Sequence, residues 1–374
     1  MAPHASTTDA AAPAVAGGPE DSPRATREDR RPGLVGSLGG RALGLGVCVL
    51  VLAASVVLSL AVGSRPVPLG TVVDALTAYD GRADHVVVLD LRVPRTVLGL
   101  LVGSALGVAG ALIQGMTRNP LADPGILGVN AGAGLGVVLG VALVGVADVG
   151  AFVWFAFGGA VVATVAVYLV GSAGRGGPTP VRLTLAGIAL GAFLSGLTLA
   201  VTLLDPASFD RLRAWGGTSG AWGSGSIAGA TPATVADVAP FVLIGLVLAL
   251  AVARPLDAVA LGDDLARSLG AHVGGTRLLV GVGVTLLCGA ATAAAGPVAF
   301  VGLMVPHVAR WAVGPLQRWI VPYSAVLGAV LVLVADVLGR VVAWPGEVPV
   351  GIVTAFVGAP VLVALVRRTR ASGL

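Results

Sequence analysis

The 374-residue chain contains no lysine, so all 23 of its basic residues are arginines. A P-loop ATPase needs a lysine to contact the nucleotide phosphates, and an enzyme that forms a Schiff base needs a lysine amine. The missing lysine therefore excludes both kinds of chemistry for this chain. If the protein works with ATP, the residues that hydrolyse it belong to another chain.

Charged residues are also scarce, at 11% of the chain against about 25% in ordinary soluble domains. Hydrophobic residues make up 56% of the chain. They fall into stretches of about 20 residues, the length of helix that crosses a bilayer core of about 30 Å. A large soluble protein would need more charge to cover its surface. The composition therefore predicts an all-α polytopic membrane protein.

Cysteine is nearly absent: Cys48 and Cys288 are the only two, and both lie inside apolar runs. We expect buried thiols, because no metal-ligand spacing surrounds either residue. A net charge of +4 would suit a nucleic-acid-binding protein, but in a membrane protein it is typical of basic cytoplasmic loops. We therefore expect no nucleic-acid partner, and no metal or other cofactor bound by this chain.

The hydrophobic stretches predict about ten transmembrane helices within residues 41–368. Residues 1–40 are expected to form a disordered cytoplasmic tail, and residues 369–374 a short cytoplasmic tail. Arg30-Arg31 suggests a twin-arginine signal, but the apolar run that follows is longer than a signal-peptide core, so we expect a retained first helix. The predicted helices are residues 41–63, 93–114, 126–146, 150–172, 181–203, 234–253, 277–295, 298–313, 320–343 and 348–366.

The arginines also predict the orientation of these helices. An even number of helices places both termini on one side of the membrane. With cytoplasmic termini, 16 arginines lie in inner segments and 7 in outer segments, which accounts for all 23. Because cytoplasmic loops carry the excess of basic residues, we expect the N- and C-termini in the cytoplasm.

Two arginines open the second predicted helix from the outer side, in the run Leu-Arg-Val-Pro-Arg at residues 91–95. Arg92 and Arg95 are three residues apart and so share one helical face, where they could form a fixed positive patch. Interfacial snorkelling of long side chains explains the same pattern, and the spacing does not decide between the two. Asp336 and Arg340 are four residues apart in a later helix, which predicts an ion pair.

Polar residues interrupt the chain on the inner side in two places. The run Asn-Pro-Leu-Ala-Asp-Pro at residues 119–124 breaks the helical pattern, and non-helical backbone at this depth must be buried in protein or line a wet cavity. Residues 254–277 form the longest inner loop, and within it Leu261, Leu265 and Leu269 share one helical face. This short amphipathic helix needs a surface to cover, either the bilayer interface or a partner protein.

Two further features have a plain structural explanation. Gly99, Gly103 and Gly107 are spaced for close helix packing in a membrane. His307 is a lone histidine in an apolar helix. We interpret it as a packing or hydrogen-bonding residue, because an ion pathway would show more ionisable neighbours. The sequence leaves the roles of His307 and Asp336 open.

The run LRVPRTVLGLLVGSALGVAGALIQGMTRNPLADPGILGVNAGAG, residues 91–134, resembles the signature of the FecCD family. Its members are the permeases of bacterial ABC importers for ferric siderophores, haem and cobalamin. Residues 261–270, 296–310, 335–340 and 347–360 fit the same family in the same order. The likeness covers about residues 41–368 and leaves out the long N-terminal tail, which is unlike most members.

The resemblance implies a fold and roles for particular residues. The family has ten helices per subunit. Its outer arginines pair with glutamates on the substrate-binding protein, and one inner loop provides coupling helices that sit on the ATPase. Two inner loops form cytoplasmic gates, and Pro180 departs from the small hydroxyl residue expected at the second gate. The matching positions are Arg92, Arg95 and Arg340 for docking; Asn119, Leu121, Thr179 and Pro180 for the gates; and Leu261, Asp263, Asp264, Arg267, Leu269 and Gly270 for coupling.

The resemblance predicts a permease subunit rather than an enzyme, in the inner membrane of a bacterium. Its expected partners are ABC ATPase subunits that use ATP and Mg, a substrate-binding protein and a second permease, either identical or paralogous. We expect a ferric siderophore as substrate, with cobalamin or haem as alternatives. An ion-coupled transporter is a further alternative, although Asp336 is the only clear carboxylate deep in a helix. So is a receptor or scaffold without transport.

Overall fold

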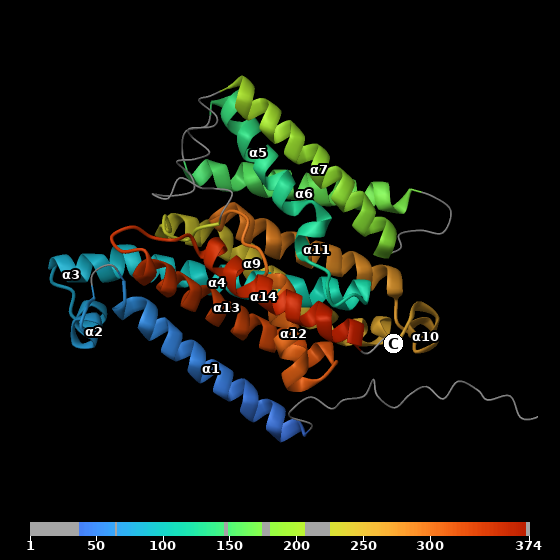
Figure 1. Cartoon of the computed structure of the whole chain (residues 1–374), viewed down its shortest axis with the longest axis horizontal. Helices are drawn as coiled ribbons and strands as arrows, with labels where there is room; N and C mark the ends of the chain where they lie inside the picture. The colour runs from blue at the N-terminus through green and yellow to red at the C-terminus, as the bar shows by residue number, and fades with distance from the viewer. Residues whose placement is uncertain (1–36, 64–65, 146–148, 174–179, 206–224, 372–374) are drawn as a thin grey trace, which may run out of the picture.

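The computed structural model describes residues 37–63, 66–145, 149–173, 180–205 and 225–371, and throughout these residues its regular structure is helical. Ten of the helices correspond to the ten predicted ones (Figure 1). They are α1 (Leu38–Ala61), α4 (Val93–Thr117), α5 (Val129–Val144), α6 (Val149–Ser172), α7 (Pro180–Leu204), α9 (Pro232–Ala260), α11 (Val273–Ala295), α12 (Val301–Val313), α13 (Gln317–Val342) and α14 (Val350–Ala371).

Five short elements complete the described part of the chain. Three of them lie between the first two predicted helices, η3 overlaps the start of the third, and α10 falls inside the predicted amphipathic loop. They are α2 (Leu69–Thr77), α3 (Ala83–Val86), the π-helical η2 (Val87–Arg92), the 3₁₀ turn η3 (Pro124–Leu127) and α10 (Asp263–Ser268). Helices α2 and α3 lie at one end of the bundle and α10 at the other (Figure 1). We call these the α3 end and the α10 end.

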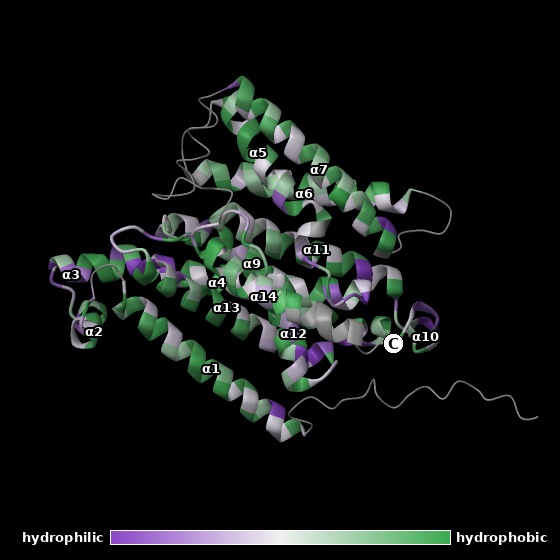
Figure 2. Cartoon of the chain, viewed as in Figure 1, coloured by the Kyte–Doolittle hydropathy of each residue, from purple (hydrophilic) through white to green (hydrophobic). Residues whose placement is uncertain are grey.

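Seven helical stretches among the described residues are long and apolar enough to cross a membrane. They include α1, the continuous run Ala83–Thr117 and α13. Helix α5 and the Val350–Val363 part of α14 are apolar but shorter, and α12 has 13 residues, which at 1.5 Å per residue is about 20 Å. Hydrophilic residues gather mainly toward the ends of the helices (Figure 2). The all-α, polytopic prediction is confirmed.

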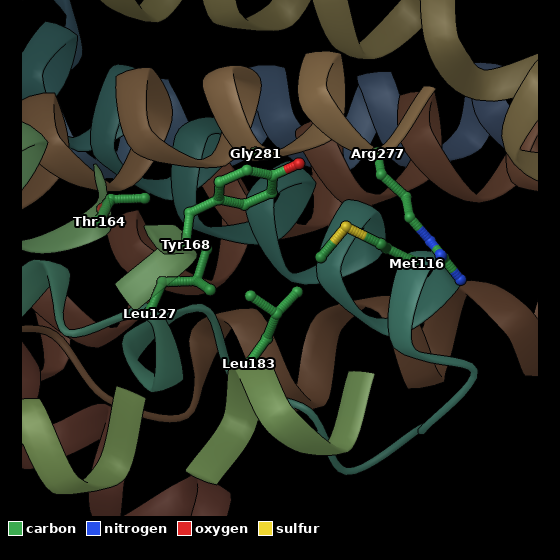
Figure 3. Close-up of a pocket in the computed structure, with 7 residues that line it drawn as sticks. All are labelled: Met116, Leu127, Thr164, Tyr168, Leu183, Arg277 and Gly281. Carbon is green, nitrogen blue, oxygen red and sulfur yellow. The ribbon is translucent and has the colours of Figure 1, made fainter. Parts of the chain in front are cut away.

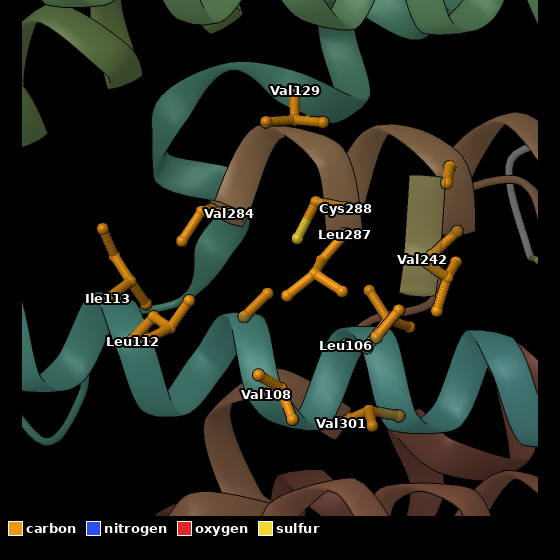
Figure 4. Packing of buried hydrophobic residues seen from close by; sticks show 14 of the residues in the cluster. Leu106, Val108, Leu112, Ile113, Val129, Val242, Val284, Leu287, Cys288 and Val301 are labelled. Carbon is orange, nitrogen blue, oxygen red and sulfur yellow. The ribbon is translucent and has the colours of Figure 1, made fainter. Parts of the chain in front are cut away.

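Helix α4 lies at the centre of the bundle and packs against α13, α11, α9 and α12. Its apolar side chains, including Val108 and Leu112, are buried with Leu287 and Val301 from two of these neighbours (Figure 4). The predicted glycine packing is confirmed. A Cβ atom at Gly103 would overlap the Gly328 carbonyl oxygen of α13, so glycine lets the two backbones touch.

The other helices surround this centre. Helices α5, α6 and α7 form a group on one side of the bundle, and α1 lies at its edge (Figure 1). Of the residues in the most apolar stretch of each helix, only 11% are buried in α1 and 6% in α7. Most of the apolar surface of these two helices therefore faces away from the rest of the chain. Cys288 is buried as predicted, whereas Cys48 on α1 is half-buried.

Several predicted boundaries were wrong. The second predicted helix begins at residue 93, whereas the helical run begins at Ala83 and includes α3 and η2 before α4. Helix α9 runs through Pro255 to Ala260, so the inner loop predicted at 254–277 begins seven residues later. A proline removes one hydrogen bond, and close packing of Leu256 and Val259 keeps this last turn helical. At the two termini, α1 begins at Leu38 and α14 ends at Ala371, while residues 1–36 lie outside the described part.

Candidate functional site

A cluster of charged residues joins three helices at the α3 end. Asp336 on α13 accepts hydrogen bonds from Arg95 on α4, at 3.1 Å from Nε and 2.7 Å from Nη2. It also accepts from Arg340, one turn further along α13, with Nε at 3.0 Å from Oδ2. The predicted pair of Asp336 and Arg340 is confirmed. The carboxylate is 3% exposed, so two guanidinium groups share one buried negative charge.

The same cluster closes the end of α1. Arg340 donates from Nη1 to the Ser59 carbonyl oxygen at 2.9 Å and to that of Val62 at 3.1 Å. Arg92 donates from Nη1 to the Leu60 carbonyl oxygen at 2.7 Å. The last carbonyl groups of a helix have no partner inside it. The two arginines therefore supply the hydrogen bonds that the final turn of α1 lacks.

The three arginines predicted to dock a partner are thus packed inside the chain. Arg92 and Arg340 are buried, and the side chain of Arg95 is 12% exposed. Arg95 also forms an ion pair with Glu347, from Nη1 to Oε2 at 2.8 Å. Two of these three charges are paired with carboxylates of the same chain, those of Arg95 and Arg340, and Arg92 binds a backbone carbonyl group. Docking by these residues stays a prediction.

At the α10 end, the segment 119–124 forms a tight turn between α4 and η3. Asn119 Oδ1 accepts from the Leu121 N–H at 2.9 Å, and Asp123 Oδ1 accepts from the Gly125 N–H at 2.8 Å. Such side-chain bonds are typical of turns that prolines keep out of a helix. Burial raises the pKa of the Asp123 carboxyl group, and the bond from Gly125 acts against this.

Leu121 is exposed at this turn, at 42%, and Asn119 is exposed beside it. Of the second predicted gate, Thr179 lies outside the described residues, and Pro180 is described only as the first residue of α7. The structure therefore brings together no complete pair of gates. The gating roles stay predictions.

The predicted short amphipathic helix is α10, and its two faces differ. Leu261, Leu265 and Leu269 are between 49% and 63% exposed, while Ala266 is fully buried. Gly262, with φ of +117°, begins the helix, and Gly270, with φ of +81°, ends it. Both backbone conformations favour glycine. The helix thus presents Leu265 outward, with the exposed Leu261 before it and Leu269 after it, and it packs against the bundle through Ala266.

The two acidic residues of α10 point in different directions. Asp264 is fully exposed and pairs with Arg267 on its own helix at 2.9 Å. Asp263 is 26% exposed and accepts from Arg118 Nη2 at 2.8 Å and from Arg277 Nη2 at 2.9 Å. Arg118 ends α4 and Arg277 lies in the first turns of α11. Asp263 therefore joins α10 to two helices of the bundle.

Sequence reasoning missed Arg118 and Arg277 as functional residues. Arg118 directly precedes the segment 119–124, and its φ of +53° is rare outside glycine. The sequence did contain a signal. Arg118 directly precedes Asn119-Pro120, where the helix ends, so a carboxylate one helical turn further along cannot pair with it. Its partner is 145 residues away, however, and no local pattern identifies it.

A small apolar cavity of about 30 Å³ lies beside this junction, between α4, η3, α6, α7 and α11 (Figure 3). Met116, Leu127, Leu183 and Arg277 are among its lining residues. A space of this size holds a water molecule or two. It cannot hold a metal chelate.

His307 and Arg310 lie on α12 within the bundle. Arg310 donates from Nη2 to Gln114 Oε1 at 3.3 Å, and the His307 ring meets Trp311 edge-on, with centroids 5.3 Å apart. The packing interpretation of His307 fits this contact. Among the described residues, no group of three or more His, Cys, Asp or Glu side chains could hold a metal ion.

The sequence of this chain is similar to those of known transport proteins. Residues 50–368 match the model of the FecCD transport family. The chain is 46% identical over 333 residues to the ferric enterobactin transport system permease protein FepD of Escherichia coli (strain K12), a match that covers 89% of this chain and 97% of FepD. It is 41% identical over 313 residues to the Fe(3+)-citrate import system permease protein YfmD of Bacillus subtilis (strain 168), covering 84% and 91% of the two chains.

A solved structure has the same fold. It is an inward-facing conformation of a metal-chelate type ABC transporter, with a TM-score of 0.75 at 24% identity. The match covers 87% of this chain and 99% of that one.

Proposed function

The chain belongs to the FecCD transport family, and from that premise we propose that it is the permease subunit of an ABC importer that moves a ferric siderophore across the cytoplasmic membrane. The observation that carries the proposal is the likeness to FepD over 97% of that permease. The chain provides the membrane path and is not an enzyme. ATP and Mg are used by a separate ATPase subunit.

The α10 end supports this assignment, because it has a surface suited to an ATPase partner. The row formed by Leu261, Leu265 and Leu269 is apolar and exposed, and charged residues lie directly beside it. An exposed apolar row rimmed by charge is typical of a protein interface. We place the α10 end and both termini in the cytoplasm, as the arginine distribution predicts.

A substrate-binding protein delivers the chelate to the α3 end in this proposal. ATP binding by the partner subunits shifts α10, and the bundle rocks so that a path between two permease subunits opens alternately to either side. The second subunit is another copy of this chain or a paralogue. No residue of the chain forms or breaks a covalent bond in these steps.

The charged cluster at the α3 end argues against ion-coupled transport. A proton or ion carrier needs a carboxylate that exchanges its ligand across the membrane. Asp336 is instead held by two arginines of its own chain. Such a paired carboxylate fixes helices rather than carrying ions.

The test is reconstitution of the permease with its ATPase and binding protein in liposomes. We expect uptake of radiolabelled ferric enterobactin or ferric citrate that requires ATP and continues when the proton gradient is collapsed. Uptake that stops with the gradient while ATP is held constant would favour an ion-coupled transporter. Complete absence of ATP-dependent uptake would favour a receptor or scaffold.

The same liposomes identify the substrate class. Parallel assays with haem and cobalamin, each with its own binding protein, separate the alternatives within the family. We expect accumulation of the ferric chelate at least about tenfold above either competitor, a difference worth about 1.4 kcal/mol. Equal or greater uptake of cobalamin would overturn the siderophore assignment and leave the importer assignment intact.

A further inference from the structure

Asp263 lies at the point where α10 meets the rest of the bundle. Its two carboxylate oxygens accept from Arg277 at 3.0 and 2.9 Å, and Oδ1 also accepts from Arg118 at 2.8 Å. We infer that Asp263 is a positioning residue that transmits movement of α10 to the turn at residues 119–124 and to α11. This inference rests on the proposed function, since an ATPase partner must move α10.

The orientation of Asp263 separates it from the surface that a partner would cover. Asp264, the next residue, is fully exposed, whereas Asp263 faces the bundle on the same side as the buried Ala266. The exposed leucines of α10 lie away from this side. A partner that binds the leucines therefore moves Asp263 without contacting it, because the carboxylate lies on the opposite side of α10.

The path from Asp263 to the turn is short and tightly bonded. Arg118 is the C-cap residue that follows Thr117, the last residue of α4, and Asn119 follows Arg118 directly. The side chain of Asn119 then binds the backbone N–H of Leu121 at 2.9 Å. A displacement of the Arg118 guanidinium group is therefore carried through two residues to the exposed Leu121 side chain. Energetic coupling between sites travels through contiguous bonded contacts of this kind.

A second contact joins the same region to α13. Asp257, near the end of α9, accepts from the Gln317 N–H at 2.5 Å at the start of α13. Residues 257–263 thus hold the ends of α4, α11 and α13 through two carboxylates. Asp263 is the one of the two that lies on α10 itself, so it is the residue that must move when α10 moves.

The junction has room to change. Arg277 lines the cavity of about 30 Å³ together with Met116, Leu127 and Leu183 (Figure 3). These residues come from the four elements α4, η3, α7 and α11, and Arg277 is the one that binds Asp263. A closely packed core resists small displacements, whereas an open space next to the contact lets the start of α11 shift without overlap. The ion pairs keep α10 and α11 together during such a shift.

The experiment compares Asp263→Asn with the unmodified importer in liposomes that contain ATPase and binding protein. Two quantities are measured together: ATP hydrolysed and radiolabelled ferric enterobactin imported. We expect basal ATP hydrolysis within about twofold of the unmodified value, and import per ATP lowered about tenfold, within the 5- to 150-fold span of allosteric coupling. Asp74→Asn on α2 is the matched control, because it makes the same change on an exposed side chain at the opposite end.

A double-mutant cycle with Arg118→Gln identifies the partner. If Asp263 acts through Arg118, the double variant loses no more import per ATP than either single variant, and Asp263→Glu restores much of it. Additive losses would overturn the inference, because each residue would then act separately. Loss of ATPase binding by Asp263→Asn would also overturn it, since Asp263 would then build the docking surface.

The outcomes separate this inference from the proposed function. If the unmodified importer shows no ATP-dependent uptake, the proposed function fails and the inference with it. If the unmodified importer transports and Asp263→Asn keeps import per ATP within about twofold, only the inference fails.

Discussion

One carboxylate is held by two arginines at each end of this molecule, and the two arrangements differ in burial. At the α3 end, Asp336 is 3% exposed and binds Arg95 and Arg340. At the α10 end, Asp263 is 26% exposed and binds Arg118 and Arg277. The chemistry is the same, but water reaches only the second carboxylate.

This difference assigns different tasks to the two ends. A buried charge without a partner is costly, so the bonds of Asp336 cannot be exchanged while α1, α4 and α13 stay together. The partly hydrated bonds of Asp263 can be broken and remade, because water replaces a lost partner. The first arrangement fixes helices, and the second suits a junction that moves.

Removing the buried charge of Asp336 should have the largest effect on the stability of the permease. Asp336→Asn removes the carboxylate that pairs with Arg340 and leaves Arg95 with Glu347 alone, and loss of one partner in a buried ion pair costs about 3–5 kcal/mol. We expect a large fall in the Tm of the purified permease in detergent, or loss of the folded protein from membranes. The exposed Asp74→Asn is the control. A Tm unchanged from the unmodified protein would show that the cluster at the α3 end is not structural.

The same substitution at the other end should cost less. Arg118 is 39% exposed and Asp263 is 26% exposed, so water replaces part of what Asp263→Asn removes, and we expect a loss of about 1 kcal/mol, typical of a partly exposed pair. Thermal unfolding of both variants in one detergent measures the ratio. If Asp263→Asn destabilises the permease as much as Asp336→Asn, the assignment of a moving junction is wrong.

Glu347 offers a smaller change at the α3 end. Its carboxylate is 28% exposed and binds Arg95 at 2.8 Å, while Asp336 holds the other side of that guanidinium group. We expect Glu347→Gln to cost about 0.5 kcal/mol. If the predicted docking is correct, it also raises the low-salt on-rate of the binding protein, because Nη1 of Arg95 loses its carboxylate partner and can bind one of the binding protein. Surface-plasmon resonance at low and high salt measures this, and an unchanged on-rate contradicts docking by Arg95.

The exposed pair of Asp264 and Arg267 gives the lower limit of the series. Both side chains are exposed and three residues apart on one short helix. Water and salt screen such a pair almost completely, so Arg267→Gln should leave the Tm of the isolated permease unchanged within error. A fall comparable to that of Asp263→Asn would mean that α10 is held mainly by its own pair.

The sequence predicted helices better than it predicted exposure. All ten apolar stretches became helices, because their length and composition leave few alternatives in a bilayer. The pair of Asp336 and Arg340 was also visible, since four residues make one helical turn. Arg95, in contrast, was considered only together with Arg92 as a positive patch, and its partner Asp336 is 241 residues away. A charge at a helix end does not reveal whether a distant helix covers it.

At the α10 end, too, local sequence predicted the helix but not its long-range ion pairs. The leucine row of α10 could be predicted, because it repeats every four residues. The bonds from Asp263 to Arg118 and Arg277 could not, because they depend on how α4, α10 and α11 converge. The extension of α9 through Pro255 was missed for a related reason: packing of the last turn outweighs the local cost of a proline.

The closure of α1 by Arg340 has a consequence for how the protein is made. The carbonyl groups at the end of α1 bind a guanidinium group 281 residues later in the chain. At about 5–20 residues per second, the ribosome needs roughly 14–56 s to reach that arginine. Arg92, 32 residues after Leu60, is synthesised far earlier. The carbonyl groups at the end of the first helix can therefore bind Arg92 early, and they gain their bonds from Arg340 only after α13 has been synthesised.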